Sequence, residues 1–382
     1  MIKKILSYFL NLPFYYLMYF VKPKKDLWIF GAWFGEKYFD NPKFLFEHLK
    51  KNYPQINAIW VTKDQSICNG QDILYKYSLK AFTLSLQASV FIVTHSTFLD
   101  IYRFINTYKR YSIQLWHGIP IKKIGSDDKA SDLKNKIKLF LFPFLKEKYS
   151  LVISSSSSDK KNMSTAFSVP IEKVAITGYP RNDVFIKQQY NNDKLKILYA
   201  PTLRDKVDDE INLFDDFGFD IKSVLKILKE YRIFLDIKMH PANKIDTKFK
   251  NSIKSEYIHF LESKIEINEI IQDYSMVISD YSGLYVDYLL TNRPIIFAPF
   301  DYEKYITKDR ELYYDYDEVT PGPKCKNWDE VLEWVVKFKE NPELYKEDRE
   351  ALKNRFHKYQ DGKSCERVYR EIIKLCKKEN DL

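Results

Sequence analysis

Histidines follow several apolar, strand-like runs of this sequence. His95 ends the run "SVFIVTH", His117 ends "YSIQLWH" and precedes Gly118, and His240 stands in "KMHP" after Lys238. Histidine titrates near neutral pH, so it can act as a base, an acid or a charged donor. His117 and His240 fall in different halves of the chain, each beside a proline-containing turn. This pairing favours catalysis over a structural role for either ring.

The stretch "SDYSGLYVDYLL" (279–290) runs from a strand-like segment directly into an apolar helical one. Ser282 and Gly283 are expected in the first helical turn, where free N–H groups and the helix dipole attract an anion. Asp287 would lie one turn further along the same face. In the alternative, Asp280 or Ser282 is a plain N-cap that binds no ligand.

Basic side chains follow other strand ends. Lys122 comes shortly after His117, and Arg204 follows a strand-like run in "APTLRD". An arginine there can clamp a phosphate through two hydrogen bonds, or it can pair with Asp205 on the surface. The net charge of +9 fits an anionic partner or a solvated lysine-rich surface. Because acidic residues are interspersed among the basic ones, the charge does not indicate nucleic acid.

Signatures of other chemistries are missing from the sequence. No GxGxxG, GxxxxGK[ST], GxSxG or HExxH pattern follows a suitable element. The 4 cysteines are scattered without a CxxC pair, which excludes a disulfide framework or zinc site and favours a reducing cytosol. We expect no metal ligands and no tightly bound cofactor, although Mg²⁺ could accompany a pyrophosphate from solvent.

Apolar runs alternate with amphipathic segments along most of the chain. The strand-like runs are 26–33, 56–62, 89–95, 111–118, 150–156, 173–180, 195–202, 232–241, 275–283 and 293–301. Most are continuous and rich in Val and Ile, which is typical of strands buried on both faces. Segments 42–51 and 221–231 have helical periodicity. This alternation predicts doubly wound parallel sheets, whose ligands bind beyond the carboxyl ends of the strands.

A polar segment without apolar periodicity, 185–194, divides the strands into two sets. We therefore predict an N-terminal hydrophobic segment over 1–25, a Rossmann-like domain over 26–187 and a second Rossmann-like domain over 188–382. The second domain is expected to end in helices.

Residues 5–21 carry no charge and are flanked by lysines on both sides. At about 1.5 Å per residue, a helix of this length is slightly shorter than a hydrocarbon core of about 30 Å. Pro13 interrupts it, and no small-residue cleavage site follows. We predict a helix that lies in the membrane interface with its lysines on anionic head groups. A helix packed on the protein's own core is the alternative, and a spanning helix is less favoured than either.

Five motifs occur in one order along the chain. They are "WHGIPIKKIG" (116–125), "YAPTLRD" (199–205), "KMHP" (238–241), "ISDYSGLYVDYLLTNRPIIFAPFDYEKY" (278–305) and "HKYQDGKSCERV" (357–368). Their order and spacing resemble the CDP-glycerol glycerophosphotransferase family, which builds wall teichoic acids and related capsular polymers. The segment "YFDNPKFLFEHL" (38–49) extends the resemblance over almost the whole chain.

The resemblance implies an α/β fold of the GT-B type, with two Rossmann-like domains facing a central cleft. The first domain would bind the acceptor, and the second the CDP-linked donor. The implied reaction transfers glycerol phosphate from CDP-glycerol to a polyprenyl-pyrophosphate-linked saccharide or a growing polymer, and releases CMP. The implied location is the cytoplasmic face of the cell membrane, with peripheral attachment to its anionic surface.

Residue by residue, the resemblance implies that His117 is the general base on the acceptor hydroxyl and that His240 stabilises the donor phosphates. Arg204, Ser282 and Asp287 match donor-binding positions. The expected substrate-binding set is completed by Gly118, Lys122, Lys238, Asp280 and Gly283. The family commonly has two serines where this chain has Ser282 and Gly283. This departure leaves another CDP-alditol, such as CDP-ribitol, open as the donor.

Two other functions fit parts of the pattern. A GT-B glycosyltransferase or an epimerase that uses a nucleotide sugar would share the fold. It would need a carboxylate late in the second domain, such as Asp301 or Glu303, to hold sugar hydroxyls. A membrane-bound scaffold without activity is the other alternative, and the paired histidines argue against it.

Overall fold

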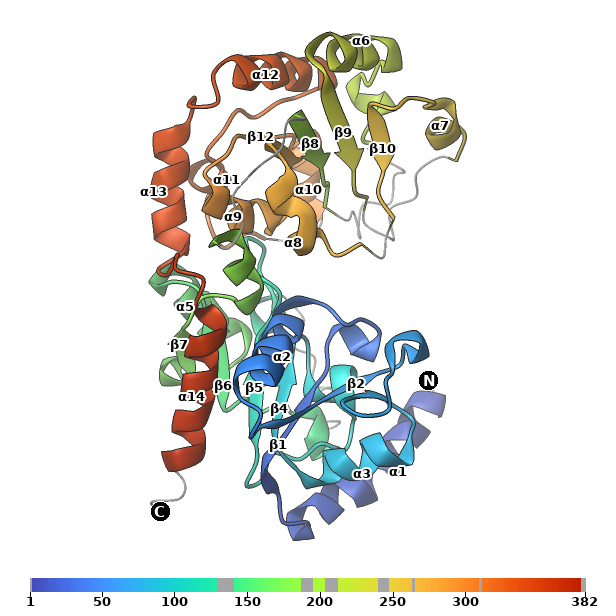
Figure 1. Cartoon of the computed structure of the whole chain (residues 1–382), viewed down its shortest axis with the longest axis vertical. Helices are drawn as coiled ribbons and strands as arrows, with labels where there is room; N and C mark the ends of the chain where they lie inside the picture. Colours follow the sequence, from blue (N-terminus) through green and yellow to red (C-terminus); the bar gives the residue numbers. More distant parts are fainter. Residues whose placement is uncertain are drawn as a thin grey trace. The chain divides into compact units, whose positions relative to one another are not determined.

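The computed structural model describes residues 2–128, 141–186, 195–202, 212–239, 247–262, 265–308 and 311–378. The chain forms two compact units, each built around one parallel sheet (Figure 1). Unit 1 comprises Met1–His117, Gly125–Asp183 and Asp361–Leu382. Unit 2 comprises Gly118–Ile124 and Val184–Gln360.

Unit 1 contains a seven-stranded sheet of order β3-β2-β1-β4-β5-β6-β7. Its strands are β1 (Lys24–Phe30), β2 (Asn57–Thr62), β3 (Ile73–Tyr75), β4 (Ala88–Val93), β5 (Tyr111–Gln114), β6 (Leu151–Ser154) and β7 (Val174–Ile176). The order changes direction between β1 and β4. This topological switch point is where open α/β sheets bind their ligands.

Alternating side chains of β1 explain how helices cover both faces of this sheet. Leu27 and Ile29 belong to one apolar core cluster together with Met18 of helix α1. Phe30 points the other way, toward Phe46, with the ring centroids 5.4 Å apart. Helices α1 and α3 therefore lie on one face, and α2 and α14 on the other (Figure 1). The helices of unit 1 are α1 (Ile2–Phe20), α2 (Asp40–Asn52), α3 (Leu79–Gln87), α5 (Ser157–Ala166) and α14 (Ser364–Lys378).

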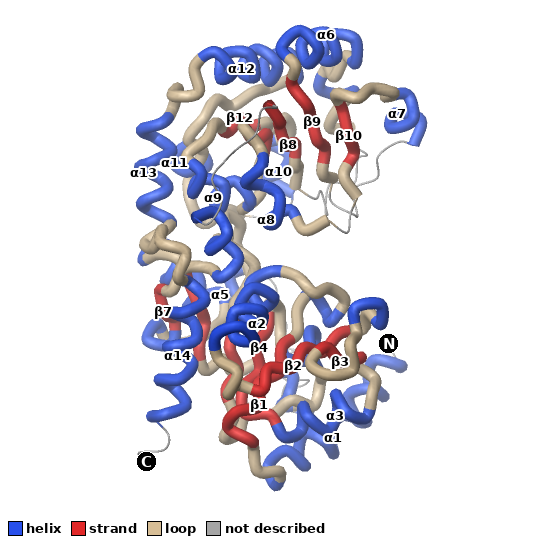
Figure 2. Tube along the Cα trace, viewed as in Figure 1, coloured by secondary structure: helices blue, strands red, loops and turns tan. Residues whose placement is uncertain are grey.

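Unit 2 contains a five-stranded sheet of order β10-β9-β8-β11-β12, in which β8, β9 and β10 are visible side by side in Figure 2. Its switch point lies between β8 and β11. Its strands are β8 (Leu195–Tyr199), β9 (Ile233–Ile237), β10 (Ile258–Phe260), β11 (Met276–Ser279) and β12 (Ile295–Phe297). Its helices are α6 (Ile221–Tyr231), α7 (Thr247–Ser252), α8 (Ile267–Ile270), α9 (Leu284–Tyr288), α10 (Tyr302–Lys308), α11 (Tyr316–Val319), α12 (Trp328–Glu340) and α13 (Lys346–Phe356). Trp328 is buried in the core and donates from its indole Nε1 to the carbonyl of Leu213 at 2.9 Å.

The predicted fold class, α/β with parallel doubly wound sheets, is confirmed. Each predicted strand-like run contains a strand, but β3 and β10 were not predicted. Both have three residues and lie at a sheet edge. Ser154 ends β6, and Ser156 caps α5 by accepting a hydrogen bond from the N–H of Asp159 at 3.3 Å.

The two units differ from the predicted domains: residues 1–25 are part of unit 1, and the change of unit follows Asp183 rather than residue 187. Residues 118–124 belong to unit 2, although they follow β5 of unit 1 in the chain. Residues 361–382 belong to unit 1, although they follow unit 2. The last part of the predicted segment 185–194 lies outside the described residues.

Helix α1 has two apolar sides. One side packs on the protein, where Tyr8 and Met18 are buried. The other side leaves large apolar side chains open to solvent, among them Phe9 (57%), Leu10 (62%) and Phe20 (86%). The fully described helices include none that is both long and apolar enough to cross a bilayer. The packed side agrees with the expected helix on the protein's own core, and the arrangement in the membrane interface stays a prediction.

Candidate active site

His117 lies three residues beyond β5, at the carboxyl edge of the sheet of unit 1. Aromatic rings surround its half-buried imidazole. The centroids of the rings of Trp116, His95 and Trp33 lie 3.8, 5.0 and 5.3 Å from that of His117. These contacts hold the imidazole in one orientation at the strand ends nearest the switch point.

The turn that carries His117 has an unusual backbone. Trp116 adopts φ 50° and Gly118 adopts φ 113°, so the chain passes through the left-handed region on both sides of the histidine. For a non-glycine residue this conformation costs roughly 1–3 kcal/mol. Two amide side chains offset the strain: Gln114 Oε1 accepts from the N–H of Trp116 at 2.9 Å, and Asn41 Nδ2 donates to the carbonyls of Leu115 and Trp116 at 3.0 Å.

Asp100 joins the two strand ends at the switch point of unit 1. Its carboxylate is fully buried and accepts hydrogen bonds from the backbone N–H groups of Phe34, Thr94 and His95 at 2.8, 2.9 and 2.7 Å. Phe34 follows β1, whereas Thr94 and His95 follow β4. One carboxylate therefore fixes both loops against which the His117 ring packs.

His95 is positioned by the same network. Its Nδ1 lies 2.9 Å from the hydroxyl of Thr94, and its carbonyl accepts from Gln114 Nε2 at 2.9 Å. Burial lowers the pKa of His95 below its usual range, which favours the neutral ring at neutral pH. A neutral ring beside His117 does not oppose the positive charge that His117 would acquire as a base.

Asp280 makes the equivalent connection in unit 2. Both of its carboxylate oxygens lie 3.0 Å from the N–H of Thr202, after β8, and Oδ1 accepts from the N–H of Tyr281, after β11, at 2.6 Å. The side chain is buried. The structure thus gives Asp280 a role in holding the backbone at the switch point.

Helix α9 begins at Leu284, with Gly283 as its N-cap residue. The hydroxyl of Ser282, one residue before the N-cap, accepts a hydrogen bond from the N–H of Leu284 at 3.2 Å. A Cβ at position 283 would lie 2.7 Å from the carbonyl oxygen of Ile119. Glycine is therefore required here by the close approach of segment 118–124. Asp287 is fully buried and accepts from Asn268 Nδ2 at 3.3 Å.

Of the remaining predicted basic residues, the structure describes Lys122 and Lys238 but not Arg204 and His240. The ammonium of Lys122 lies 5.8 Å from the ring centroid of Tyr305, and that of Lys238 donates to the carbonyl of Glu262 at 2.5 Å. Arg204 and His240 lie outside the described residues. The expected pairing of His117 with His240 therefore stays a prediction.

Asp301 and Glu303 are the two carboxylates that could hold sugar hydroxyls in a nucleotide-sugar enzyme, and they differ in burial. Asp301 is buried and accepts from the hydroxyl of Tyr281 at 3.0 Å. Glu303 is exposed on α10. Within the described ranges, no group of three or more His, Cys, Asp or Glu side chains could hold a metal ion.

Several residues of this site were not predicted from the sequence. Trp33 packs on His117, and its Nε1 donates to Asp40 Oδ2 at 3.1 Å. Asp40 is itself paired with Arg181 at 3.0 Å. In the sequence, the run "GAWFG" places Trp33 just after a strand, and this position could have indicated that Trp33 belongs to the site. Asp40 is seven residues from Trp33 in the sequence, whereas Asp100 and Arg181 are distant from it, and no local pattern marks the contacts of these three side chains.

The two parallel sheets, each with polar groups ordered at its switch point, define a two-unit α/β protein of the GT-B type. The family model "CDP-Glycerol:Poly(glycerophosphate) glycerophosphotransferase" matches residues 14–374. The chain belongs to this family and is an enzyme of the glycerophosphotransferase class.

Curated relatives agree with this assignment. The chain is 28% identical over 376 residues to a "Teichoic acid glycerol-phosphate transferase" of Staphylococcus aureus, covering 92% of this chain and 94% of the relative. It is 28% identical over 380 residues to a "Teichoic acid poly(glycerol phosphate) polymerase" of Bacillus spizizenii, covering 91% and 92%.

Solved structures share the fold. The structure titled "Structure of the Wall Teichoic Acid Polymerase TagF" superposes with a TM-score of 0.77 at 24% identity, covering 95% of this chain and 91% of that one. A UDP-N-acetylglucosamine 2-epimerase superposes with a TM-score of 0.53 at 12% identity, covering 92% and 96%. The second likeness is more remote, as expected for proteins that share only the GT-B type of fold.

Proposed function

We propose that this enzyme transfers glycerol phosphate from CDP-glycerol to a hydroxyl of a teichoic-acid-type acceptor, with release of CMP. The observation that carries the proposal is the family match over residues 14–374 together with a histidine, His117, braced at the switch point of unit 1. The names of the two curated relatives support glycerol phosphate as the transferred group.

In the proposed mechanism, His117 accepts the proton of the acceptor hydroxyl while that oxygen attacks the phosphorus that carries glycerol. A new oxygen–phosphorus bond forms, and the bond from this phosphorus to the oxygen of CMP breaks. The protein contributes mainly position and charge, because phosphoryl transfer needs little covalent help. The rings of Trp33, Trp116 and His95 would set the direction of the imidazole.

The donor side of the mechanism draws on unit 2. His240, Arg204 and Lys238 would supply positive charge to the two phosphates, and Ser282 a hydroxyl. Asp280 would act indirectly by keeping the ends of β8 and β11 together. No step is assigned to a metal ion, although Mg²⁺ could enter with the donor.

We further propose a lipid-linked acceptor and peripheral attachment to the cytoplasmic face of the membrane. The exposed apolar side of α1 supports attachment, because Phe9, Leu10 and Phe20 are large hydrophobic side chains open to solvent. Lysines 22, 24 and 25 follow this helix and would lie near anionic head groups.

The proposal is tested by CMP release from the purified enzyme with a lipid-pyrophosphate disaccharide acceptor. CDP-glycerol, CDP-ribitol and a UDP-sugar are offered in parallel. We expect turnover of CDP-glycerol and a loss of roughly 10²–10⁴-fold in His117→Ala, the usual contribution of a general base. The matched control is His259→Ala, which removes an exposed histidine of β10.

Two results would contradict the proposal. Retained activity in His117→Ala would remove the assigned base. Turnover of the UDP-sugar alone would leave the fold intact but overturn the reaction. Turnover of CDP-ribitol instead of CDP-glycerol would correct only the donor.

A further inference from the structure

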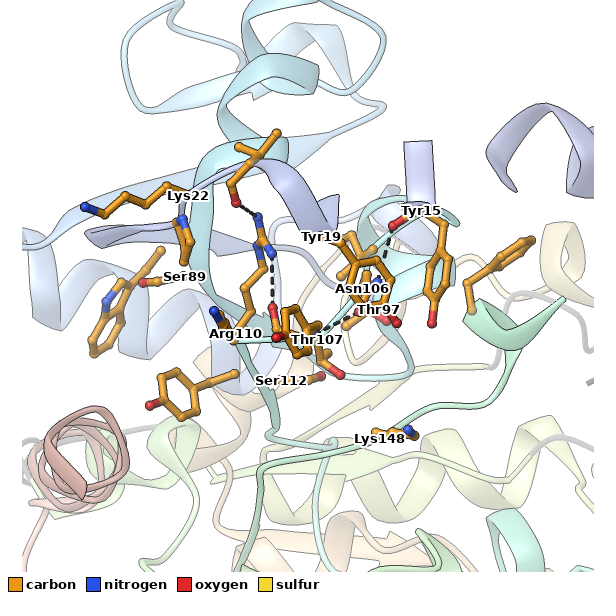
Figure 3. Close-up of a pocket in the computed structure, with 18 of the residues that line it drawn as sticks. Tyr15, Tyr19, Lys22, Ser89, Thr97, Asn106, Thr107, Arg110, Ser112 and Lys148 are labelled. Carbon is orange, nitrogen blue, oxygen red and sulfur yellow. Dashed lines mark hydrogen bonds between the residues drawn. The ribbon is translucent and has the colours of Figure 1, made fainter. Parts of the chain in front are cut away.

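Unit 1 contains a cavity of about 1320 Å³ beneath the end of helix α1 (Figure 3). It reaches the amino ends of the strands at Lys25, Ser89 and Ser112. Its other walls come from α1, from segment 143–148 and from the last turns of α14. The volume exceeds the roughly 300–1,000 Å³ of ordinary small-molecule pockets.

Arg110 holds the end of α1 in place as one wall of the cavity. Its buried guanidinium donates to the carbonyls of Met18 and Val21 at 2.7 and 2.8 Å, and to that of Ala88 at 3.1 Å. These bonds fasten the end of α1 to the start of β4. Asn106 adds a bond from Nδ2 to the carbonyl of Tyr15 at 3.3 Å. The cavity is therefore framed by specific interactions (Figure 3).

The charge of the lining is almost entirely positive. The lysines that line the cavity are Lys22, Lys25, Lys109, Lys146, Lys148 and Lys377. Glu147 is the one carboxyl group among the described lining residues. Burial raises the pKa of Glu147 to about 8, so this side chain is protonated at neutral pH and does not cancel the lysines.

The rest of the lining is apolar and continues onto the surface. Tyr15, Tyr19 and Phe144 face the cavity, and the buried ring of Trp28 lies in the same wall. Phe20 also lines it and is 86% exposed, so the cavity adjoins the open apolar side of α1. A ligand that matches these walls carries both an anionic head and an apolar chain.

We propose that this cavity binds one anionic glycerophospholipid of the membrane, with its phosphate among the lysines and an acyl chain along the aromatic wall. The inference rests on the proposed membrane attachment and adds a specific lipid site to it. Such a site would hold the enzyme at anionic bilayers more firmly than the surface of α1 alone.

The position of the lysines favours a bilayer lipid over the acceptor lipid. Lys25 is the second residue of β1, whereas the loop with Trp33 follows the carboxyl end of that strand. The strand rises about 3.3 Å per residue, which separates the two edges by roughly 17 Å. A phosphate held at Lys25 would thus be far from the imidazole of His117.

Fluorescence quenching tests the depth of binding. The full-length enzyme is mixed with phosphatidylcholine vesicles that contain phosphatidylglycerol with brominated acyl chains. We expect quenching of tryptophan fluorescence that falls by at least half in Trp28→Phe, because Trp28 lines the cavity. The matched control, Trp60→Phe, removes a buried tryptophan of β2 that does not line it and should keep the quenching.

Charge reversal tests the head-group site. Lys146→Glu with Lys148→Glu should weaken binding to the same vesicles roughly tenfold or more. Lys160→Glu with Lys161→Glu changes the net charge equally on α5 and should have a clearly smaller effect. Thermal unfolding of each variant, compared with that of the wild type, confirms that it is folded.

Each failure has a distinct meaning. Vesicle binding with equal quenching in Trp28→Phe and the wild type would overturn the lipid site and leave attachment through α1. No vesicle binding would overturn both the lipid site and membrane attachment, while CMP release still tests the reaction. Displacement of the brominated lipid by a polyprenyl phosphate at lower concentration than by phosphatidylglycerol would assign the cavity to the acceptor lipid and refute the proposal.

Discussion

Asp100 and Asp280 perform the same task in the two units. Each is a buried carboxylate that accepts backbone N–H bonds from the loops after both strands at its switch point. These strands are β1 and β4 for Asp100, and β8 and β11 for Asp280. Parallel strands have no hydrogen bonds beyond their carboxyl ends to keep diverging loops together. A carboxylate at each switch point supplies that connection and orders the loops. In unit 1, these loops hold the residues that pack on His117.

The residue-scale test of this role is Asp100→Ala. We expect the free energy of unfolding to fall by about 3 kcal/mol, since buried N–H groups lose a charged acceptor. CMP release should fall as well, because the loops of Phe34 and His95 hold His117. The control is Asp220→Ala, which removes the exposed N-cap of α6 and should lower stability only slightly without impairing the catalytic step. Wild-type stability and activity in Asp100→Ala would refute the role.

The tight packing at Gly283 leaves no room for a side chain at this position. Gly283→Ser introduces a side chain whose Cβ would lie 2.7 Å from the Ile119 carbonyl oxygen. We expect a loss of about 1–3 kcal/mol of stability from overpacking, measured by chemical unfolding. Gly283→Ala should lose a similar amount, which separates the steric effect from the hydroxyl. If the serine variant is fully stable, glycine is not needed for packing at this position.

Sequence reasoning found the residues that lie directly at strand ends. His117, Asp280 and Ser282 are of this kind, because position after a strand is visible in the sequence. The partners that brace them were not found. Asn41 bonds to carbonyls 74 and 75 residues away, and no local pattern predicts such a contact.

At the scale of elements, the buried strands were the easiest to predict. Central strands such as β1 and β4 are continuous apolar runs, because helices cover both faces. Strands β3 and β10 are short edge strands that are only partly buried, so their side chains carry little pattern. Helix α1 was predicted as a helix, but its sequence is apolar all round and does not show which side packs.

The exposed apolar side of helix α1 is expected to contact the membrane. Leu10→Glu with Phe20→Glu places charges on its exposed side, where both side chains are more than half open to solvent. We expect weaker sedimentation with anionic vesicles and unchanged CMP release with a water-soluble acceptor. Leu79→Glu is the matched control, since Leu79 of α3 is also an exposed apolar residue at 80%. Equal vesicle binding in wild type and double variant would show that this side does not meet the membrane.

At the scale of the whole molecule, the buried Glu147 should make global stability depend on pH. Burial raises its pKa from 4.5 to about 8. Between these values the folded state keeps a proton that the unfolded state has released, so stability falls as pH rises through this window. Glu147→Gln removes the effect.

The measurement is the difference in melting temperature between Glu147→Gln and the wild type. From pH 5 to pH 8.5, the melting temperature of the wild type should fall relative to that of Glu147→Gln, because only the wild type has this titrating group. Glu172→Gln, which replaces an exposed glutamate, should show no such trend. A constant difference at every pH would show that Glu147 is ionised normally in the folded protein.

The sequence revealed only part of the division into two units. Composition marks a polar segment near 185–194, and the change of unit after Asp183 lies close to it. The return of α14 to unit 1 depends on tertiary contacts. Tyr369 stacks on Tyr53 with centroids 3.7 Å apart, and Asp183 accepts from the N–H groups of Ser364 and Cys365 at 2.8 and 2.9 Å.

This return has a consequence for the order of events on the ribosome. Unit 2 is synthesised between the main part of unit 1 and the helix that completes it. At about 5–20 residues per second, unit 1 would wait roughly 10–40 s for α14. During this interval the sheet face that carries Trp28 would lack Tyr369, its partner at 6.1 Å. Unit 2 can therefore finish folding first, while the nascent N-terminal half still exposes an apolar surface that a chaperone would recognise.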